Sequence, residues 1–205
     1  MKKLSIEKIR SLILESLVEI IEQSARGQSS QEFTLDSAEE EEEAIEIPGV
    51  GVMIDPNANF AFPVPISSFN VNQYIPERFR AGSENRPTHS GDDWQVPEGT
   101  IVISVGDGVV ASIEKTPGTS DGCGCRISLD IDNLGRVIYC HLNSIKVSKG
   151  EKVTKGQIIG SSGGKPSDPC SGTSTGPHLH FSLQQSSDKS VYDLFYSQCT
   201  GFKPL

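Results

Sequence analysis

The four histidines of this chain, His89, His141, His178 and His180, are the side chains best suited to metal binding or proton transfer. His178 and His180 are separated by one residue, and in a β-strand residues i and i+2 point to the same face. The two imidazoles would therefore project together, with Leu179 facing the opposite side. Neighbouring imidazoles of this kind can bind a metal ion or transfer protons.

Residues earlier in the chain could complete such a metal site. A catalytic zinc site uses three protein ligands and keeps one position for water, so the histidine pair needs another ligand. His89 and Asp93 are four residues apart across Gly91, and a turn there would bring both side chains to one ion. Asp92 is a competing ligand. Each feature alone has a simpler explanation, because surface histidines, histidines packed in strands and a His-to-Asp spacing of four are all common. Only their combination predicts a metal site.

The segment that must position these residues has the composition of a turn-rich β domain. The chain contains 20 Gly and 12 Pro, with 35% hydrophobic residues. From residue 48 onward, short β-rich runs alternate with Gly, Pro, Asn and Asp, which is typical of strands joined by turns. The predicted strands are residues 101–105, 109–114, 126–131, 136–141 and 178–183. We predict that residues 48–205 form a mainly β domain, an antiparallel sheet arranged as a sandwich or barrel.

Residues 147–160 have glycines at a six-residue spacing, Gly150 and Gly156, with hydrophobic residues before each turn. This pattern predicts a β-hairpin. It also resembles the hairpin of biotinyl and lipoyl carrier domains. However, the lysines of this segment do not occupy the tip motifs in which those carriers present their modified lysine.

The first 47 residues differ from the rest in charge and pattern. Apolar residues recur at three- and four-residue steps between residues 4 and 21, which predicts an amphipathic helix over residues 1–23. Its apolar face would dock on a partner, on another copy or on the domain behind it. Residues 24–47 include five consecutive glutamates at 39–43, which predict a flexible acidic linker or, alternatively, a solvated extension of the helix.

The charge distribution excludes several classes of protein. Residues 1–47 carry five Lys and Arg against 12 Asp and Glu, a net charge of −7, and the rest carry 13 against 15, a net charge of −2. Without a basic stripe, nucleic-acid binding is not expected. Charged residues interrupt the apolar run near the start, so no cleavable signal peptide is predicted. No run approaches the roughly 18–20 apolar residues of a membrane span.

The chain has five cysteines, so at least one thiol lies outside any internal disulfide. Cys123 and Cys125 are separated by one residue, which is shorter than the spacing usual in structural zinc sites. We therefore expect these cysteines to be buried or paired in disulfides.

The segments around the histidines resemble those of the lysostaphin-like, LytM-type zinc endopeptidases, over about residues 60–184. The matching segments are, in chain order, Phe-Pro-Val-Pro at 62–65, His-Ser-Gly-Asp-Asp-Trp at 89–94, Pro-Glu-Gly-Thr at 97–100, Gly-Asp-Gly-Val-Val at 106–110, Tyr-Cys-His-Leu at 139–142 and Ser-Thr-Gly-Pro-His-Leu-His-Phe at 174–181. The 147–160 segment follows the 139–142 motif, as it does in that family.

This resemblance implies one zinc ion bound by His89, Asp93 and His180, with His141 and His178 as catalytic residues. The implied function is hydrolysis of peptide cross-links or stem peptides of bacterial peptidoglycan by a metal-activated water. His178 would be the general base, and His141 would stabilise the oxyanion or protonate the leaving amine. The alternative is a non-catalytic LytM-type scaffold, or a structural virion component that binds the cell wall. In such a protein, ligands or catalytic histidines would be expected to be missing.

The sequence departs from the family pattern at three places. Ser182 stands where an acidic residue often follows the closing motif, and residues 116–125 and 161–173 are longer than usual. We expect these two loops to border the substrate groove and to affect specificity. The enzyme is expected to act at the bacterial cell wall. The predicted helix could attach it to a larger assembly, such as a bacteriophage tail or capsid, so that it is virion-associated or released on lysis.

Overall fold

The computed structural model describes residues 45–47, 52–55, 57–65, 71–115, 122–199 and 203–204. The chain divides into Met1–Glu41 and Glu42–Leu205, and all described residues belong to the second unit. The helix predicted for residues 1–23 lies outside the described residues. So does the linker predicted for residues 24–47, except for its last three residues, which form strand β1 (Ile45–Ile47).

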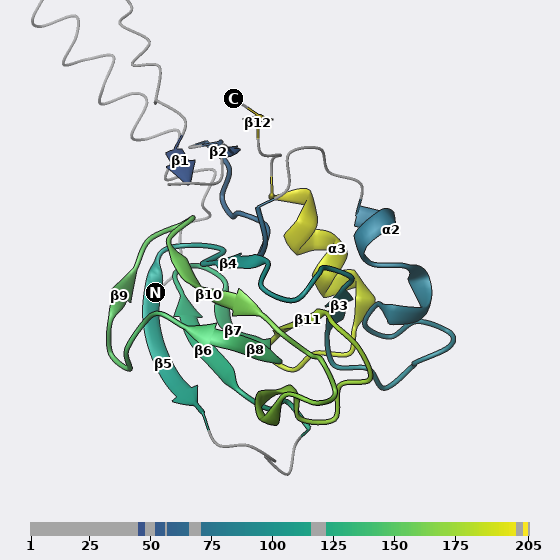
Figure 1. Ribbon diagram of the computed structural model, residues 1–205. Coiled ribbons are helices and arrows are strands. Elements are labelled where there is room, and N and C mark those ends of the chain that lie inside the picture. The colour runs from purple at the N-terminus through teal and green to yellow at the C-terminus, as the bar shows by residue number, and fades with distance from the viewer. Residues whose placement is uncertain are drawn as a thin grey trace, which may run out of the picture. The chain divides into compact units, whose positions relative to one another are not determined.

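The largest sheet of the described residues has six strands in the order β3-β11-β7-β6-β5-β9 (Figure 1). The strands are β3 (Asp92–Trp94), β5 (Gly108–Glu114), β6 (Arg126–Ile131), β7 (Gly135–Cys140), β9 (Lys152–Val153) and β11 (Leu179–Leu183). β11 is the last of these strands in the sequence, yet it lies between β3 and β7. The sheet therefore joins two histidine-containing segments that are far apart in the chain.

Two smaller sheets of three strands each accompany it. One has the order β4-β10-β8 and the other β1-β2-β12. Their remaining strands are β4 (Ile101–Ile103), β8 (Leu142–Ile145), β10 (Ile158–Ser162), β2 (Val52–Ile54) and β12 (Lys203–Pro204). All paired strands in the described ranges run antiparallel. The prediction of a mainly β, antiparallel domain is confirmed, while a sandwich or barrel arrangement stays a prediction.

The five strands predicted from the sequence are all present, with small shifts at their ends. The segment 126–131 coincides with β6. The ends of β7 and β11 leave His141 one residue after β7 and His178 one residue before β11. Both histidines therefore lie where regular strand gives way to loop, a position that lets a side chain face a cavity.

The prediction of a hairpin over residues 147–160 is wrong, because its two strands do not pair with each other. β9 pairs with β5, whereas β10 pairs with β4 and β8. The turns themselves are present, because Gly150 and Gly156 have φ angles of 82° and 83°, in the left-handed region that favours glycine. Hydrophobic periodicity thus identified strands and turns, but the partner of each strand depends on segments elsewhere in the chain.

Helix α3 (Lys189–Ser197) packs against the β3 and β11 end of the large sheet. It begins after Asp188, whose carboxylate accepts a hydrogen bond from the Ser190 N–H at 2.9 Å, a typical N-cap. The Phe195 ring centroid lies 5.6 Å from that of Phe181 on β11. This helix was not predicted from the sequence.

Among the described residues, the other helical segments are short: α2 (Val71–Tyr74) and the 3-10 helices η1 (Glu77–Phe79) and η2 (Pro169–Ser171). Within the described ranges, no helix has the length and apolar character needed to cross a membrane.

The core beneath β3 and β11 is aromatic. Trp94, Tyr139, Phe181, Tyr192 and Phe195 are at most 1% exposed. Each such side chain removes on the order of 150–250 Å² from water. The strands that carry the predicted ligands therefore rest on a closely packed base, which limits how far their backbones can move.

Candidate metal centre

The pairing of β11 with β3 places two of the predicted ligands next to each other. His180 lies directly opposite Asp93 in the strand register, and the Cβ atoms of such cross-strand neighbours are about 4.5–5.5 Å apart. The side chains of His178 and His180 are 13% and 15% exposed, whereas Leu179 between them is fully buried. The predicted alternation, with both imidazoles on one face, is therefore observed.

The turn before β3 brings His89 to the same place, with its Nε2 atom 3.1 Å from Asp93 Oδ1. Gly91 makes this approach possible, because its backbone lies against the His180 ring. A Cβ atom on Gly91 would be 2.5 Å from His180 Nε2 and 2.8 Å from the Phe181 carbonyl oxygen. Any side chain at position 91 would push the turn and the ring apart.

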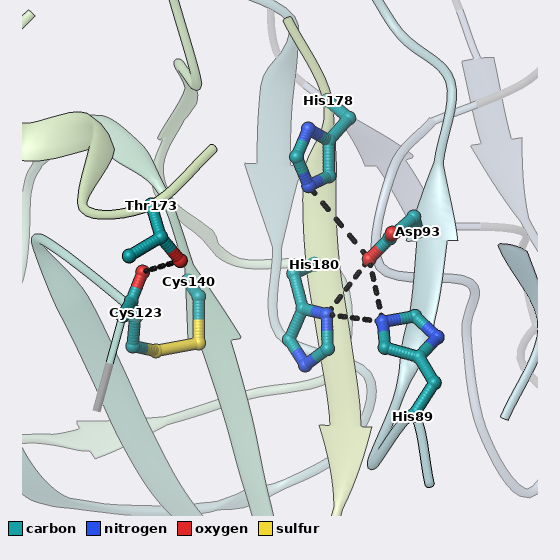
Figure 2. The surroundings of a disulfide bond; sticks show 8 residues. His89, Asp93, Cys123, Cys140, Thr173, His178 and His180 are labelled. Atoms are coloured by element: carbon teal, nitrogen blue, oxygen red, sulfur yellow. Dashed lines mark hydrogen bonds and ion pairs between the residues drawn. A yellow bond between two sulfur atoms is a disulfide. The ribbon is translucent and has the colours of Figure 1, made fainter. Parts of the chain in front are cut away.

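Three atoms with lone pairs converge in this centre, as Figure 2 shows. His89 Nε2 lies 3.2 Å from His180 Nδ1, which in turn lies 2.8 Å from Asp93 Oδ1. A tetrahedral ion with bonds of about 2.0–2.1 Å holds its ligand atoms roughly 3.3 Å apart. The spacing and the donor set of two nitrogens and one oxygen therefore fit zinc. Within the part of the chain that the structure describes, these three residues form the cluster able to hold a metal ion. Three protein ligands leave a fourth position for water, as in catalytic sites.

The carboxylate of Asp93 is ionised and held in place by its neighbours. Burial by itself would raise its pKa, but hydrogen bonds with His180 and His89 outweigh burial and hold the pKa well below its usual range. Its second oxygen, Oδ2, lies 2.5 Å from Arg86 Nη1. Arg86 thus orients the carboxylate and leaves Oδ1 for the centre.

Sequence reasoning did not identify Arg86. Its only signal in the sequence is its position three residues before His89, in a segment without a recognised motif.

The competing ligand Asp92 points away from the centre. Its Oδ1 accepts a hydrogen bond from the Ala81 N–H at 2.7 Å, and its Oδ2 accepts one from the Tyr196 hydroxyl at 2.8 Å. Burial raises its pKa, although these two hydrogen bonds oppose that shift. Adjacent residues of a strand face opposite sides, so β3 directs Asp93 to the centre and Asp92 to helix α3.

His178 presents a proton acceptor to the centre. Its Nδ1 lies 2.8 Å from the Gly176 carbonyl oxygen and 3.2 Å from Ser174 Oγ. A carbonyl oxygen only accepts hydrogen bonds, so Nδ1 carries the proton in the neutral ring. Nε2 then has the lone pair, and it lies 3.7 Å from Asp93 Oδ1. The ring can therefore take a proton on its metal-facing side.

His141 is the most buried imidazole next to the centre. Its ring centroid lies 4.7 Å from that of His178 and 6.0 Å from that of His180. Burial, reinforced by these two histidines, lowers its pKa to about 4, so the ring is neutral at pH 7. A neutral imidazole can donate its N–H without adding positive charge.

A cavity of about 1150 Å³ opens onto these histidines. Its wall includes Cys123, from the long segment 116–125, and Thr173, from the long segment 161–173. Each loop thus contributes residues to the cavity wall, Gly122 and Cys123 from the first and Thr173 from the second, and their effect on a substrate groove stays a prediction. Ser182, at the position that is often acidic in the resembling family, also lines the cavity but does not belong to the metal cluster.

The sequence that forms this site is similar to those of known proteins. Residues 87–192 match the model of the family described as Peptidase family M23. The chain is 36% identical over 112 residues to the peptidoglycan DD-endopeptidase ShyA of Vibrio cholerae, covering 55% of this chain and 24% of that protein. It is 39% identical over 98 residues to the glycyl-glycine endopeptidase ALE-1 of Staphylococcus capitis, covering 47% of this chain and 25% of that protein.

Among solved structures, the catalytic domain of lysostaphin from Staphylococcus simulans matches with a TM-score of 0.38 and 30% identity, covering 61% of this chain and 78% of that one. The chain spans 24% and 25% of the lengths of ShyA and ALE-1, so it corresponds to about a quarter of each of these curated relatives.

Proposed function

Since this chain belongs to peptidase family M23, we propose that it is a zinc-dependent endopeptidase that hydrolyses peptide cross-links or stem peptides of bacterial peptidoglycan. One zinc ion is held by His89, Asp93 and His180, and the catalytic residues are His141 and His178. The observation that carries this proposal is the convergence of three ligand atoms beside two further imidazoles in one cavity. The substrate follows from the relatives, whose names describe peptidoglycan and glycyl-glycine endopeptidases.

Zinc, when bound, supplies Lewis acidity that polarises a carbonyl and makes water nucleophilic near neutral pH. His178 acts as the general base at Nε2, the nitrogen that its tautomer leaves unprotonated. Its Nδ1–H stays hydrogen-bonded to the Gly176 carbonyl, which stabilises the imidazolium that forms when Nε2 takes the proton. This pairing fixes both the tautomer and the orientation of the base.

His141 acts on the other side of the reaction. It hydrogen-bonds the oxygen on which negative charge develops, or it passes a proton to the leaving amine. Its position beside His178 and His180 supports either role. Because the ring is buried and preoriented, its hydrogen bond costs little reorganisation during the reaction.

The charges that line the cavity favour a substrate with free carboxylates. The charged residues of its wall are Arg86, Arg126 and Asp93, so with a divalent ion bound the wall is positive. Stem peptides of peptidoglycan carry carboxylates, whereas glycine bridges carry no charge along their length. A positive cavity concentrates anionic substrates, so we expect stem-peptide bonds to be cut faster than glycine bridges.

A non-catalytic scaffold is the second candidate. Such a protein would be expected to lack ligands or catalytic histidines, but all five positions are filled. A ring nitrogen of each of His89, His178 and His180 lies within 3.7 Å of Asp93 Oδ1. This completeness favours the enzyme.

The experiment is digestion of purified peptidoglycan by the zinc-loaded chain, with the released muropeptides identified by mass spectrometry. We expect soluble fragments that disappear with a chelator and return when zinc is added back. The matched control is His180→Ala, which should bind no zinc and release nothing. If the zinc-loaded protein bound peptidoglycan but released no fragment from any wall type, the protein would be a non-catalytic scaffold and the proposed activity would be refuted.

We also propose that residues 1–23 and 24–47 attach the peptidase to a larger assembly, such as a phage tail or capsid, which delivers it to the cell wall in the virion or on lysis. The support is the amphipathic pattern of the first segment and the acidity of the second. If so, residues 42–205 alone, which keep strand β1, should cut soluble muropeptides as fast as the full chain does.

A further inference from the structure

Two disulfides lie beside His141. Cys123 is bonded to Cys140, the residue immediately before His141, and Cys125 is bonded to Cys170 in η2. Figure 2 shows the first of these bonds in the view that contains the metal centre. We call the segments joined here, residues 122–125, 140–142 and 168–174, the disulfide corner.

The disulfide corner holds the backbone on both sides of the His141 side chain. The His141 N–H donates to the Cys123 carbonyl at 2.9 Å, and the Leu142 N–H donates to the Cys125 carbonyl at 3.0 Å. The acceptor of the first hydrogen bond, Cys123, is also the disulfide partner of Cys140, the residue before His141. The backbone of His141 is therefore bound to a segment that is itself covalently attached to its neighbour.

His141 needs such support because its backbone is in an unfavourable conformation. Its φ angle is 59°, in the left-handed region that a residue with a side chain rarely adopts. Such conformations persist only where the surrounding structure holds them, and they occur often at functional sites. Without the attachment, the backbone would relax and the imidazole would turn away from its position beside His178.

The second disulfide joins residues 122–125 to the loop that contains Cys170 and Ser171. The Cys125 N–H donates to the Cys170 carbonyl at 2.9 Å, and the carbonyl of the next residue, Ser171, interacts with the His141 ring and partly offsets the lowering of its pKa. The packing is close, because a Cβ atom on Gly124 would be 2.0 Å from the Cys170 carbonyl oxygen. The second disulfide thus joins the segment that holds the His141 backbone to the loop that contains Ser171.

The ligands are held by other means. Asp93 and His180 lie on strands β3 and β11, which are joined by the hydrogen bonds of the sheet and rest on the aromatic core. His89 reaches them through the turn at Gly91. The metal centre should therefore keep its form when the disulfides are absent, whereas the position of His141 should not.

We propose that Cys123, Cys125, Cys140 and Cys170 are positioning residues for the His141 imidazole, so that turnover requires both disulfides while zinc binding does not. The inference rests on the proposed function, since it assigns the disulfides to the catalytic step. In a compartment that keeps thiols reduced, the chain binds zinc but turns over slowly, and it becomes active once oxidised.

The first test compares the paired variants Cys123→Ser/Cys140→Ser and Cys125→Ser/Cys170→Ser with the wild type. The control is Cys199→Ser, which changes the buried free cysteine. We measure zinc content, thermal unfolding, and kcat and KM on soluble cross-linked muropeptides. Both paired variants should keep one zinc per chain and a similar KM, with kcat lowered about 100-fold, the loss that a misplacement of roughly 1 Å can cause. The control should match the wild type.

The second test reduces and reoxidises the wild type with a phosphine, which binds zinc weakly. Each disulfide takes two electrons from the phosphine and two protons from water to give two thiols, and the phosphine becomes its oxide with the oxygen of that water. The reduced, zinc-loaded protein should lose activity and regain it on reoxidation, whereas a variant with all four of these cysteines replaced by serine should respond to neither step.

Imidazole proton–nitrogen correlation spectra of the zinc-loaded protein provide a readout independent of activity. On reduction, the His141 signals should shift or broaden, while those of His89 and His180 stay in place. The proposal is overturned if the reduced protein turns over at the wild-type rate, if the His141 signals do not change, or if zinc is lost together with activity. An oxidised wild type that is inactive, but whose His141 signals still respond to reduction, would refute the proposed function and leave the structural role of the disulfides standing.

Discussion

Replacing Gly91 by alanine tests the packing on which the metal centre depends. The added methyl carbon would lie 2.5 Å from His180 Nε2, and ordinary van der Waals contacts begin at 3.4 Å, so the ring or the turn must move by 3.4 − 2.5 = 0.9 Å. The Phe181 carbonyl oxygen, 2.8 Å away, is a second close contact of the methyl group. Zinc–ligand distances tolerate only about ±0.2 Å, so the displaced His180 no longer fits the ion.

We expect Gly91→Ala to weaken zinc binding about 10- to 100-fold, as the loss of support for metal ligands typically does. This corresponds to about 1.4–2.8 kcal/mol. Zinc affinity is measured by competition with a chromogenic chelator, and thermal unfolding with and without zinc separates loss of metal from loss of fold. The melting temperature should fall mainly in the presence of zinc, because the metal-dependent stabilisation is lost.

The matched control is Gly176→Ala, because an added Cβ at position 176 would have no atom within 4 Å. It should bind zinc like the wild type. If Gly91→Ala also kept the wild-type zinc affinity, then the turn could yield by 0.9 Å at no cost, and the argument that glycine permits the close approach to His180 would be refuted.

Three further predictions concern neighbouring residues. His178→Ala should keep its zinc but lower kcat by about 10²- to 10⁴-fold, the usual contribution of a general base; full activity measured on muropeptides would exclude His178 from that role. Asp93→Asn should lose zinc, whereas Asp92→Asn should keep it. Asp92→Asn should instead lower the free energy of unfolding by about 1–3 kcal/mol, because the amide can no longer accept hydrogen bonds from both the Ala81 N–H and the Tyr196 hydroxyl. Urea denaturation measures the free energy of unfolding, and metal analysis measures the zinc content. Zinc loss in both variants would contradict the assignment of Asp93 as the ligand. Arg86→Met should weaken zinc binding about 10- to 100-fold, because Asp93 Oδ2 loses its partner, and Arg86→Lys should have a smaller effect. An unchanged zinc affinity of Arg86→Met would mean that the histidines alone orient the carboxylate.

The strand pattern and the shared face of His178 and His180 could be predicted from the sequence because they depend on local periodicity, whereas the full set of candidate site residues was implied by the resemblance to LytM-type endopeptidases. Alternation along a strand put His178 and His180 on one face and Leu179 in the core, and the structure has this arrangement. The segment 126–131 became β6 without any shift. Such features require only the backbone geometry of a single segment, so one sequence is sufficient to infer them.

Other features were decided by contacts between distant segments. β9 paired with β5 rather than with β10, because strand pairing depends on the whole sheet and not on the turn between two strands. The choice of Asp93 over Asp92 followed from the register of β3 against β11 and from the donors of Ala81 and Tyr196 behind it. Helix α3, which supplies Tyr196, was itself missed.

The sequence by itself determined which residues could form a metal-dependent site and what kind of domain carries them. Only the tertiary structure decided how that site is supported: Arg86 on the second carboxylate oxygen, and two disulfides around His141. The number of cysteines predicted an unpaired thiol but not which cysteines pair, because pairing depends on how loops far apart in the chain meet. Support of this kind has no periodicity or fixed spacing, since it arises from proximity in space.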